Sequence, residues 1–106
     1  MVRKDFDLIY DAGAAGHLSC IPKKYHSMIR ESVEERLSFE PEKEAKNRKP
    51  LVGSSLFDMG WELRCGARNE FMVFYRTDNI KKEVYILAIG VKKKNKLIIG
   101  KEEVPL

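Results

Sequence analysis

Seven lysine and arginine side chains lie before, within or directly after three short apolar segments, at Arg48, Lys49, Arg64, Arg68, Lys92, Lys93 and Lys94. Cations beside a sheet can hold RNA phosphates and stabilise the charge that develops at a scissile phosphate. Arg64 stands in mid-segment between apolar residues, where a guanidinium needs a carboxylate or a phosphate as its partner. For Lys94 and Lys96 the simpler alternative is a lysine-rich turn that keeps an edge strand soluble.

Aromatic residues in the same segments could stack on nucleic-acid bases. Alternation along the segments places Trp61, Phe71 and Tyr75 on the core side, where aromatic residues pack most often. Phe74 falls on the opposite face and is predicted to be the stacking platform. Glu62 falls on that face too, so the sequence predicts a mixed surface that could line a groove.

Other kinds of site have no support in the residue spacing. The two histidines and two cysteines, at 17, 26, 20 and 65, lack the spacing of zinc ligands, so no metal is expected. His17 and His26 are interpreted as surface or capping residues. A phosphate-binding GxxxxGK pattern and a serine nucleophile elbow are both absent, and no cofactor is predicted.

Length and composition favour one domain spanning residues 1–106, since a chain of this size buries one modest core. The net charge of +4 favours an acidic partner. No apolar run is long enough to span a membrane, and the first residues lack the apolar core of an export signal. Two cysteines without a CxxC pattern are typical of reduced thiols, so we expect a cytoplasmic protein with Cys65 buried.

The apolar patterns predict the elements that must position these cations. A strand is expected over 4–10, followed by a glycine-containing break over 11–16 and a short helical turn through His17 and Leu18. A helix is predicted over 22–39, and a second short helix over 41–47 is an option before a loop over 53–55. Strands are predicted over 61–66, 71–76 and 84–91, and the last of these is expected at the centre of the sheet. An edge strand is expected over 97–99. The expected fold class is α+β, a small antiparallel sheet of about four strands with N-terminal helices packed on one face.

The order of these motifs resembles the RelE/ParE toxin superfamily over nearly the whole chain. The resemblance rests on the lead-in Arg48-Lys49-Pro50-Leu51, the strand end Trp61-Glu62-Leu63-Arg64-x-Gly66, the aromatic strand that follows, and the ending Ile89-Gly90-x-Lys92. It implies the toxin of a type II toxin–antitoxin module, whose partner is a cognate antitoxin from a neighbouring gene. The ribonuclease branch binds the ribosome and cleaves mRNA, whereas the ParE branch poisons DNA gyrase.

Within that resemblance, Arg64 and Lys92 match cationic positions of the ribonucleases and are the predicted catalytic residues, with Glu62 as a base. The ribonucleases usually carry a lysine at the position of Glu62, an arginine at Met72, and a tyrosine or histidine at Ile98. The resemblance implies inhibition of translation by ribosome-dependent mRNA cleavage, and the three differing residues imply that the cleavage could take a divergent form. The alternative is a non-catalytic binding protein, either a ParE-like gyrase inhibitor or an inactive regulatory partner of an antitoxin.

Overall fold

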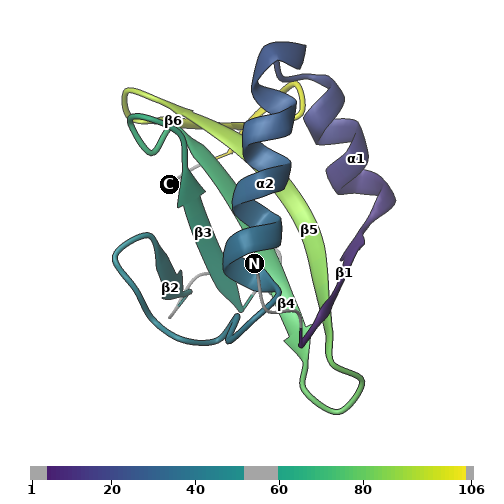
Figure 1. Ribbon diagram of the computed structural model, residues 1–106. Helices are drawn as coiled ribbons and strands as arrows, with labels where there is room; N and C mark the ends of the chain where they lie inside the picture. Colours follow the sequence, from purple (N-terminus) through teal and green to yellow (C-terminus); the bar gives the residue numbers. More distant parts are fainter. Residues whose placement is uncertain (1–4, 52–59, 105–106) are drawn as a thin grey trace.

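The computed structural model describes residues 5–51 and 60–104, and within them seven strands form one sheet (Figure 1). The order is β2-β3-β4-β5-β6-β7, and β1 also pairs with β5. The pairing is antiparallel except between β1 and β5. The elements are β1 (Asp7–Tyr10), α1 (Ala12–Ser19), a 3-10 turn (Lys23–Tyr25), α2 (His26–Leu37), β2 (Arg48–Pro50), β3 (Trp61–Cys65), β4 (Phe71–Asp78), β5 (Glu83–Lys93), β6 (Lys96–Ile99) and β7 (Glu102–Val104).

β5 is the central strand, and it organises the rest of the sheet. One of its edges pairs with β4 from Glu83 to Val91. Its other edge is shared: residues 83–86 pair with β1, and residues 90–93 pair with β6. The predicted central position of the 84–91 strand is confirmed, because apolar residues on both of its faces are covered.

The larger core lies between the sheet and α2, which crosses one face of it (Figure 1). Ile29, Val33 and Leu37 recur at the spacing of one helical face, and all three are fully buried. The predicted apolar stripe is therefore confirmed. The α-helix itself begins at His26, because the residues after Pro22 form a 3-10 turn instead.

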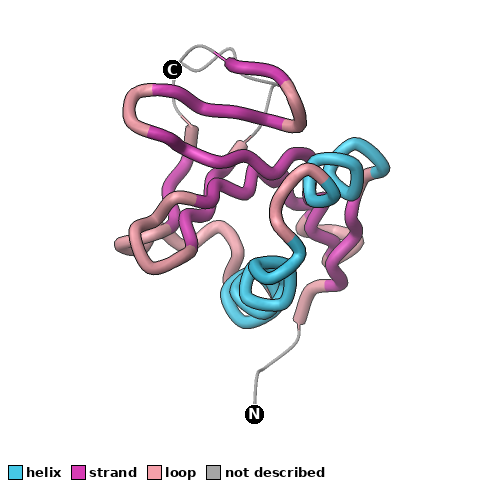
Figure 2. Tube along the Cα trace, turned by 90° about the horizontal axis from the view of Figure 1, so that it is seen from above, coloured by secondary structure: helices cyan, strands magenta, loops and turns pink. Residues whose placement is uncertain are grey.

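A second core cluster lies on the opposite face of the sheet. Met72 and Phe74 from β4 are covered there by Leu97 and Ile99 from β6. Figure 2 shows the β6–β7 hairpin on the side of the sheet away from α2. This close approach depends on Gly90, where a Cβ atom would lie 2.9 Å from Leu97 Cδ1 and 3.0 Å from Ile99 Cγ1.

The expected fold class is wrong. The sheet has seven strands rather than about four, and the described residues contain only two α-helices, of 8 and 12 residues. Of these, α2 covers one face, whereas α1 packs along β5 (Figure 1). The strand count was too low because β2 and β7 have only three residues each, too few for an alternating pattern to be recognised. The strand predicted over 97–99 is present as β6, but β6 pairs with both β5 and β7, so its predicted edge position is wrong.

Two local predictions also need correction. Residues 12–19 form a full α-helix rather than a break, because the Asp11 carboxylate accepts a hydrogen bond from Gly13 N at 2.9 Å and caps it. Residues 41–47 form no helix, and a bridge between Ala45 and Arg48 starts the lead-in to β2 instead. The loop predicted over 53–55 lies outside the described residues.

Tyr75 ties the sheet to the loop after α2. Its ring is fully buried, and its hydroxyl donates to the Pro41 carbonyl at 2.6 Å. We expect Tyr75→Phe to lower the free energy of unfolding by about 1–2 kcal/mol, because the buried carbonyl loses its partner. Urea unfolding measures this loss. Tyr85→Phe is the control, since the Tyr85 hydroxyl bonds the Glu83 side chain near the surface; equal losses in both variants would contradict the assignment.

Candidate cationic groove

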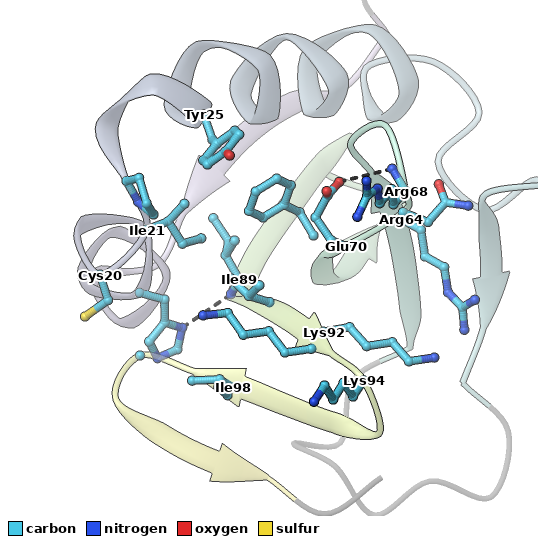
Figure 3. Close-up of a pocket in the computed structure, with 17 residues that line it drawn as sticks. Cys20, Ile21, Tyr25, Arg64, Arg68, Glu70, Ile89, Lys92, Lys94 and Ile98 are labelled. Atoms are coloured by element: carbon cyan, nitrogen blue, oxygen red, sulfur yellow. Dashed lines mark hydrogen bonds between the residues drawn. The ribbon is translucent and has the colours of Figure 1, made fainter.

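A groove of about 810 Å³ opens between the end of α1, the β3–β4 turn and the ends of β5 and β6 (Figure 3). Its walls carry five cations and a single carboxylate, and its apolar lining comes from the segment between α1 and α2 and from the sheet. The cations are Arg64, Arg68, Lys92, Lys93 and Lys94, and the carboxylate is Glu70. The apolar and aromatic lining residues are Ile21, Pro22, Tyr25, Phe71, Ile89, Val91 and Ile98.

Tight turns bring these cations together. In the β3–β4 turn, Gly66 has φ +98° and Asn69 has φ +54°. The side chain of Glu70 accepts from Arg68 N at 3.3 Å, and its carbonyl accepts from Lys92 N at 2.7 Å. The β3–β4 turn is thereby joined to the end of β5, so cations separated in sequence share one wall.

Five of the nine predicted site residues line this groove, and they include both predicted catalytic cations, Arg64 and Lys92. The excess of positive over negative side chains suits an anionic ligand that binds through several phosphates. Apolar surface beneath a charged rim also suits a ligand with flat or apolar groups between its charges.

Glu62 lies elsewhere and is held as a structural carboxylate. It is 3% exposed, and its Oε1 atom lies 3.5 Å from Lys49 Nζ and 3.6 Å from Arg64 Nη2. Its Oε2 atom is buried without a hydrogen-bond partner. Since Lys49 faces Glu62 across the β2–β3 pair, this carboxylate links two strands and does not line the groove.

Two further predicted residues lie away from the groove. Phe74 is 1% exposed and belongs to the core cluster under β6, so the predicted stacking platform is corrected to a core residue. The Arg48 side chain turns toward the end of α2, where it donates to the Arg36 carbonyl. Neither residue can reach a ligand in the groove in this conformation.

His17 and Tyr25 also line the groove, although neither was a predicted site residue. His17, in the last turn of α1, accepts a hydrogen bond at Nδ1 from Ile89 N at 3.3 Å. Burial lowers the pKa of His17, and the nearby Asp11 carboxylate opposes this shift. The Tyr25 ring packs against Phe71 with centroids 5.1 Å apart. These contacts join distant parts of the chain, and no local pattern signals them.

The two thiols differ sharply in exposure. Cys65 is buried as predicted, and burial raises its pKa to about 11, whereas Cys20 is exposed. We expect a thiol reagent to label Cys20 in the native protein and Cys65 only in urea, because a buried thiol is neutral and shielded. Mass spectrometry of the modified peptides measures this. Rapid labelling of Cys65 without denaturant would contradict its burial.

The raised pKa of Cys65 also has a consequence for stability. A folded-state pKa above the ordinary value of 9.0 stabilises the fold below that pH, and this contribution is lost as pH rises toward about 11. We expect the urea midpoint to fall over this range, and to fall less in Cys65→Ala, which cannot ionise there. An equal fall in both proteins would contradict this account.

No family model, curated protein or solved structure matches the chain.

Residues 5–51 and 60–104 contain no cluster of three or more acidic, histidine or cysteine side chains able to hold a metal ion. In the same part of the chain, neither helix has the length and apolar character required to cross a membrane. The site is therefore defined by its own geometry, as a cationic groove on a seven-stranded sheet.

Proposed function

We propose that this protein is the toxin of a type II toxin–antitoxin module and that it inhibits translation by binding RNA in the cationic groove. The observation that carries the proposal is the convergence of five cations and one carboxylate around an apolar floor. RNA phosphates would contact the rim. Unpaired bases would contact the floor at Tyr25, which is partly exposed and packs on the buried ring of Phe71.

The resemblance to RelE/ParE toxins supports this proposal through particular residues. Arg64 and Lys92, the two positions that match cations of the ribonuclease branch, line the same groove. In this proposal the protein acts in the cytoplasm, where it meets ribosomes and mRNA. A cognate antitoxin would neutralise it by covering the groove with an acidic, partly apolar segment, since such a segment complements the same rim and floor.

The first experiment is induction of the protein alone in a bacterium, with growth followed over time. We expect growth arrest, and we expect Arg64→Ala and Lys92→Ala to relieve it at matched protein levels. Co-expression of the protein from the adjacent reading frame should restore growth. Absence of arrest, or full toxicity of both variants, would overturn the proposal.

The proposed inhibition could proceed with cleavage of the bound mRNA, as in the ribonuclease branch, or without cleavage, and the position of Glu62 favours inhibition without cleavage. The carboxylate predicted as a base is buried and paired with Lys49 and Arg64, outside the groove. Mapping mRNA 5′ ends after induction separates the two mechanisms: cleavage produces new ends within codons, whereas binding produces none. A supercoiling assay with DNA gyrase tests the ParE-like form of the non-catalytic alternative.

A further inference from the structure

In the part of the chain that the structure describes, no strand pairs with one edge of the middle of β5. Residues 83–86 pair with β1 on that edge and residues 90–93 pair with β6, so residues 87–89 fall between the two. The last turn of α1 packs at this position, and the Ile89 N–H donates to His17 Nδ1 at 3.3 Å. An imidazole thus takes the place of a strand partner in the sheet.

This contact determines which ring nitrogen carries the proton. Because Nδ1 accepts the Ile89 N–H, it cannot itself be protonated, and the proton of the neutral ring lies on Nε2. Burial lowers the pKa of His17 and so favours the neutral ring. Asp11, at the start of α1, is the charged group that opposes burial. His17 is therefore neutral at pH 7.5, with Nε2 as a hydrogen-bond donor.

His17 lines the groove, and within the described residues its Nε2 atom has no hydrogen-bond partner. Gly100, in the β6–β7 turn, lies beside this atom: a Cβ atom there would approach His17 Cδ2 to 3.3 Å and Nε2 to 3.9 Å. Glycine at position 100, where φ is +66°, keeps a side chain away from the donor.

We propose that His17 is a ligand-binding residue of the groove, whose neutral Nε2–H donates to a phosphate oxygen of bound RNA. The inference rests on the proposed function and adds a neutral donor in a fixed position, which the lysine and arginine side chains do not supply. Lysine and arginine attract any phosphate nearby, whereas a single N–H fixed by the sheet selects one oxygen position. The same ring thus serves the fold through Nδ1 and the ligand through Nε2.

Two substitutions separate these two roles. The side-chain oxygen of asparagine can replace Nδ1, so His17→Asn keeps an acceptor for the Ile89 N–H and leaves no donor at the position of Nε2. The amide nitrogen of glutamine can reach the position of Nε2, so His17→Gln keeps the donor and removes the acceptor. His26→Gln is the control, because His26 bonds the Ile21 carbonyl and does not itself line the groove.

The probe is a fluorescein-labelled single-stranded RNA of about ten nucleotides, followed by fluorescence anisotropy at pH 7.5. Urea unfolding of each variant is measured in parallel. We expect His17→Asn to bind about tenfold more weakly or worse with a nearly unchanged urea midpoint, because a hydrogen bond to a charged group is lost. His17→Gln should bind within about threefold of wild type yet unfold at lower urea, because the Ile89 N–H loses its acceptor.

Wild-type affinity in His17→Asn overturns the inference, and so does an equal loss of affinity in both variants. If wild type binds RNA and Arg64→Ala weakens binding while His17→Asn does not, the proposed function stands and the role of His17 falls. If wild type has no affinity for the RNA, both fall.

Discussion

Replacing both Arg64 and Lys92 by alanine is expected to weaken RNA binding by about a hundredfold or more. Both side chains line the groove, on β3 and at the end of β5, and the proposed function has each of them contact a phosphate. The Arg64 guanidinium also lies 3.6 Å from Glu62 Oε1, so it would reach a phosphate from this ion pair. A hydrogen bond to a charged group contributes about 1.5 kcal/mol or more, and about 1.4 kcal/mol corresponds to a factor of ten. Fluorescence anisotropy in about 0.1 M salt measures the change.

The salt dependence provides a second measurement on the same variant. Each phosphate contact on single-stranded nucleic acid contributes a slope of about 0.7 to the fall of log affinity with log salt. Loss of two contacts should therefore flatten the slope by about 1.4. An unchanged slope would show that these side chains do not neutralise phosphates.

The matched control is the double variant Arg76→Ala and Lys81→Ala. It removes the same charge from the protein, but both side chains are exposed near the β4–β5 turn and neither lines the groove. Affinity should fall only slightly, through the lower net charge. If the control weakens binding as much as the groove variant, binding depends on overall charge, and the groove has no special role.

The largest expected effect on stability is that of Gly90→Val. A Cβ atom at this position would lie 2.9 Å from Leu97 Cδ1, 3.0 Å from Ile99 Cγ1 and 3.1 Å from the Ile98 carbonyl oxygen. Leu97 is fully buried, so β6 has to move away from β5. Overpacking of this kind costs about 3 kcal/mol or more for a branched side chain, and about 1–3 kcal/mol for alanine. Urea unfolding measures both variants.

Gly16→Ala is the control, and it should change stability in the opposite direction. Gly16 lies within α1, and a Cβ atom there has no neighbour within 4 Å. Alanine should stabilise the helix by roughly 0.5–1 kcal/mol, because glycine loses more backbone freedom on folding. A Gly90→Val variant as stable as wild type would contradict the close packing of β6 on β5.

The parts of the fold that sequence predicted are those with long apolar patterns. β3, β4, β5 and α2 each place enough apolar residues at regular spacing to be recognised. The short strands at both edges of the sheet do not, and the parallel pairing of β1 with β5 depends on the route of the chain through both helices. The expected fold class was wrong for these reasons.

For the site, sequence identified cations but not which of them share a groove. Arg64 and Lys92 were chosen from their places in and after strands, and both line the groove. Glu62 and Phe74 alternate with core residues along their strands, which is also the pattern expected of exposed residues. Phe74 is buried because β6 covers the second face of the sheet, and Glu62 is buried beside its ion-pair partners Lys49 and Arg64. Alternation alone predicts neither contact.

By itself, the sequence determined the cationic character of the site and the apolar strands that carry it, because residue type and alternation are local properties. The tertiary structure decided which charges are neutralised, as at Glu62, and which are gathered, as at Lys92. It also brought His17 to Ile89 across 72 residues of chain. This contact requires that β1 and β6 leave residues 87–89 of β5 unpaired on one edge, and the pairing of β5 depends on the whole sheet.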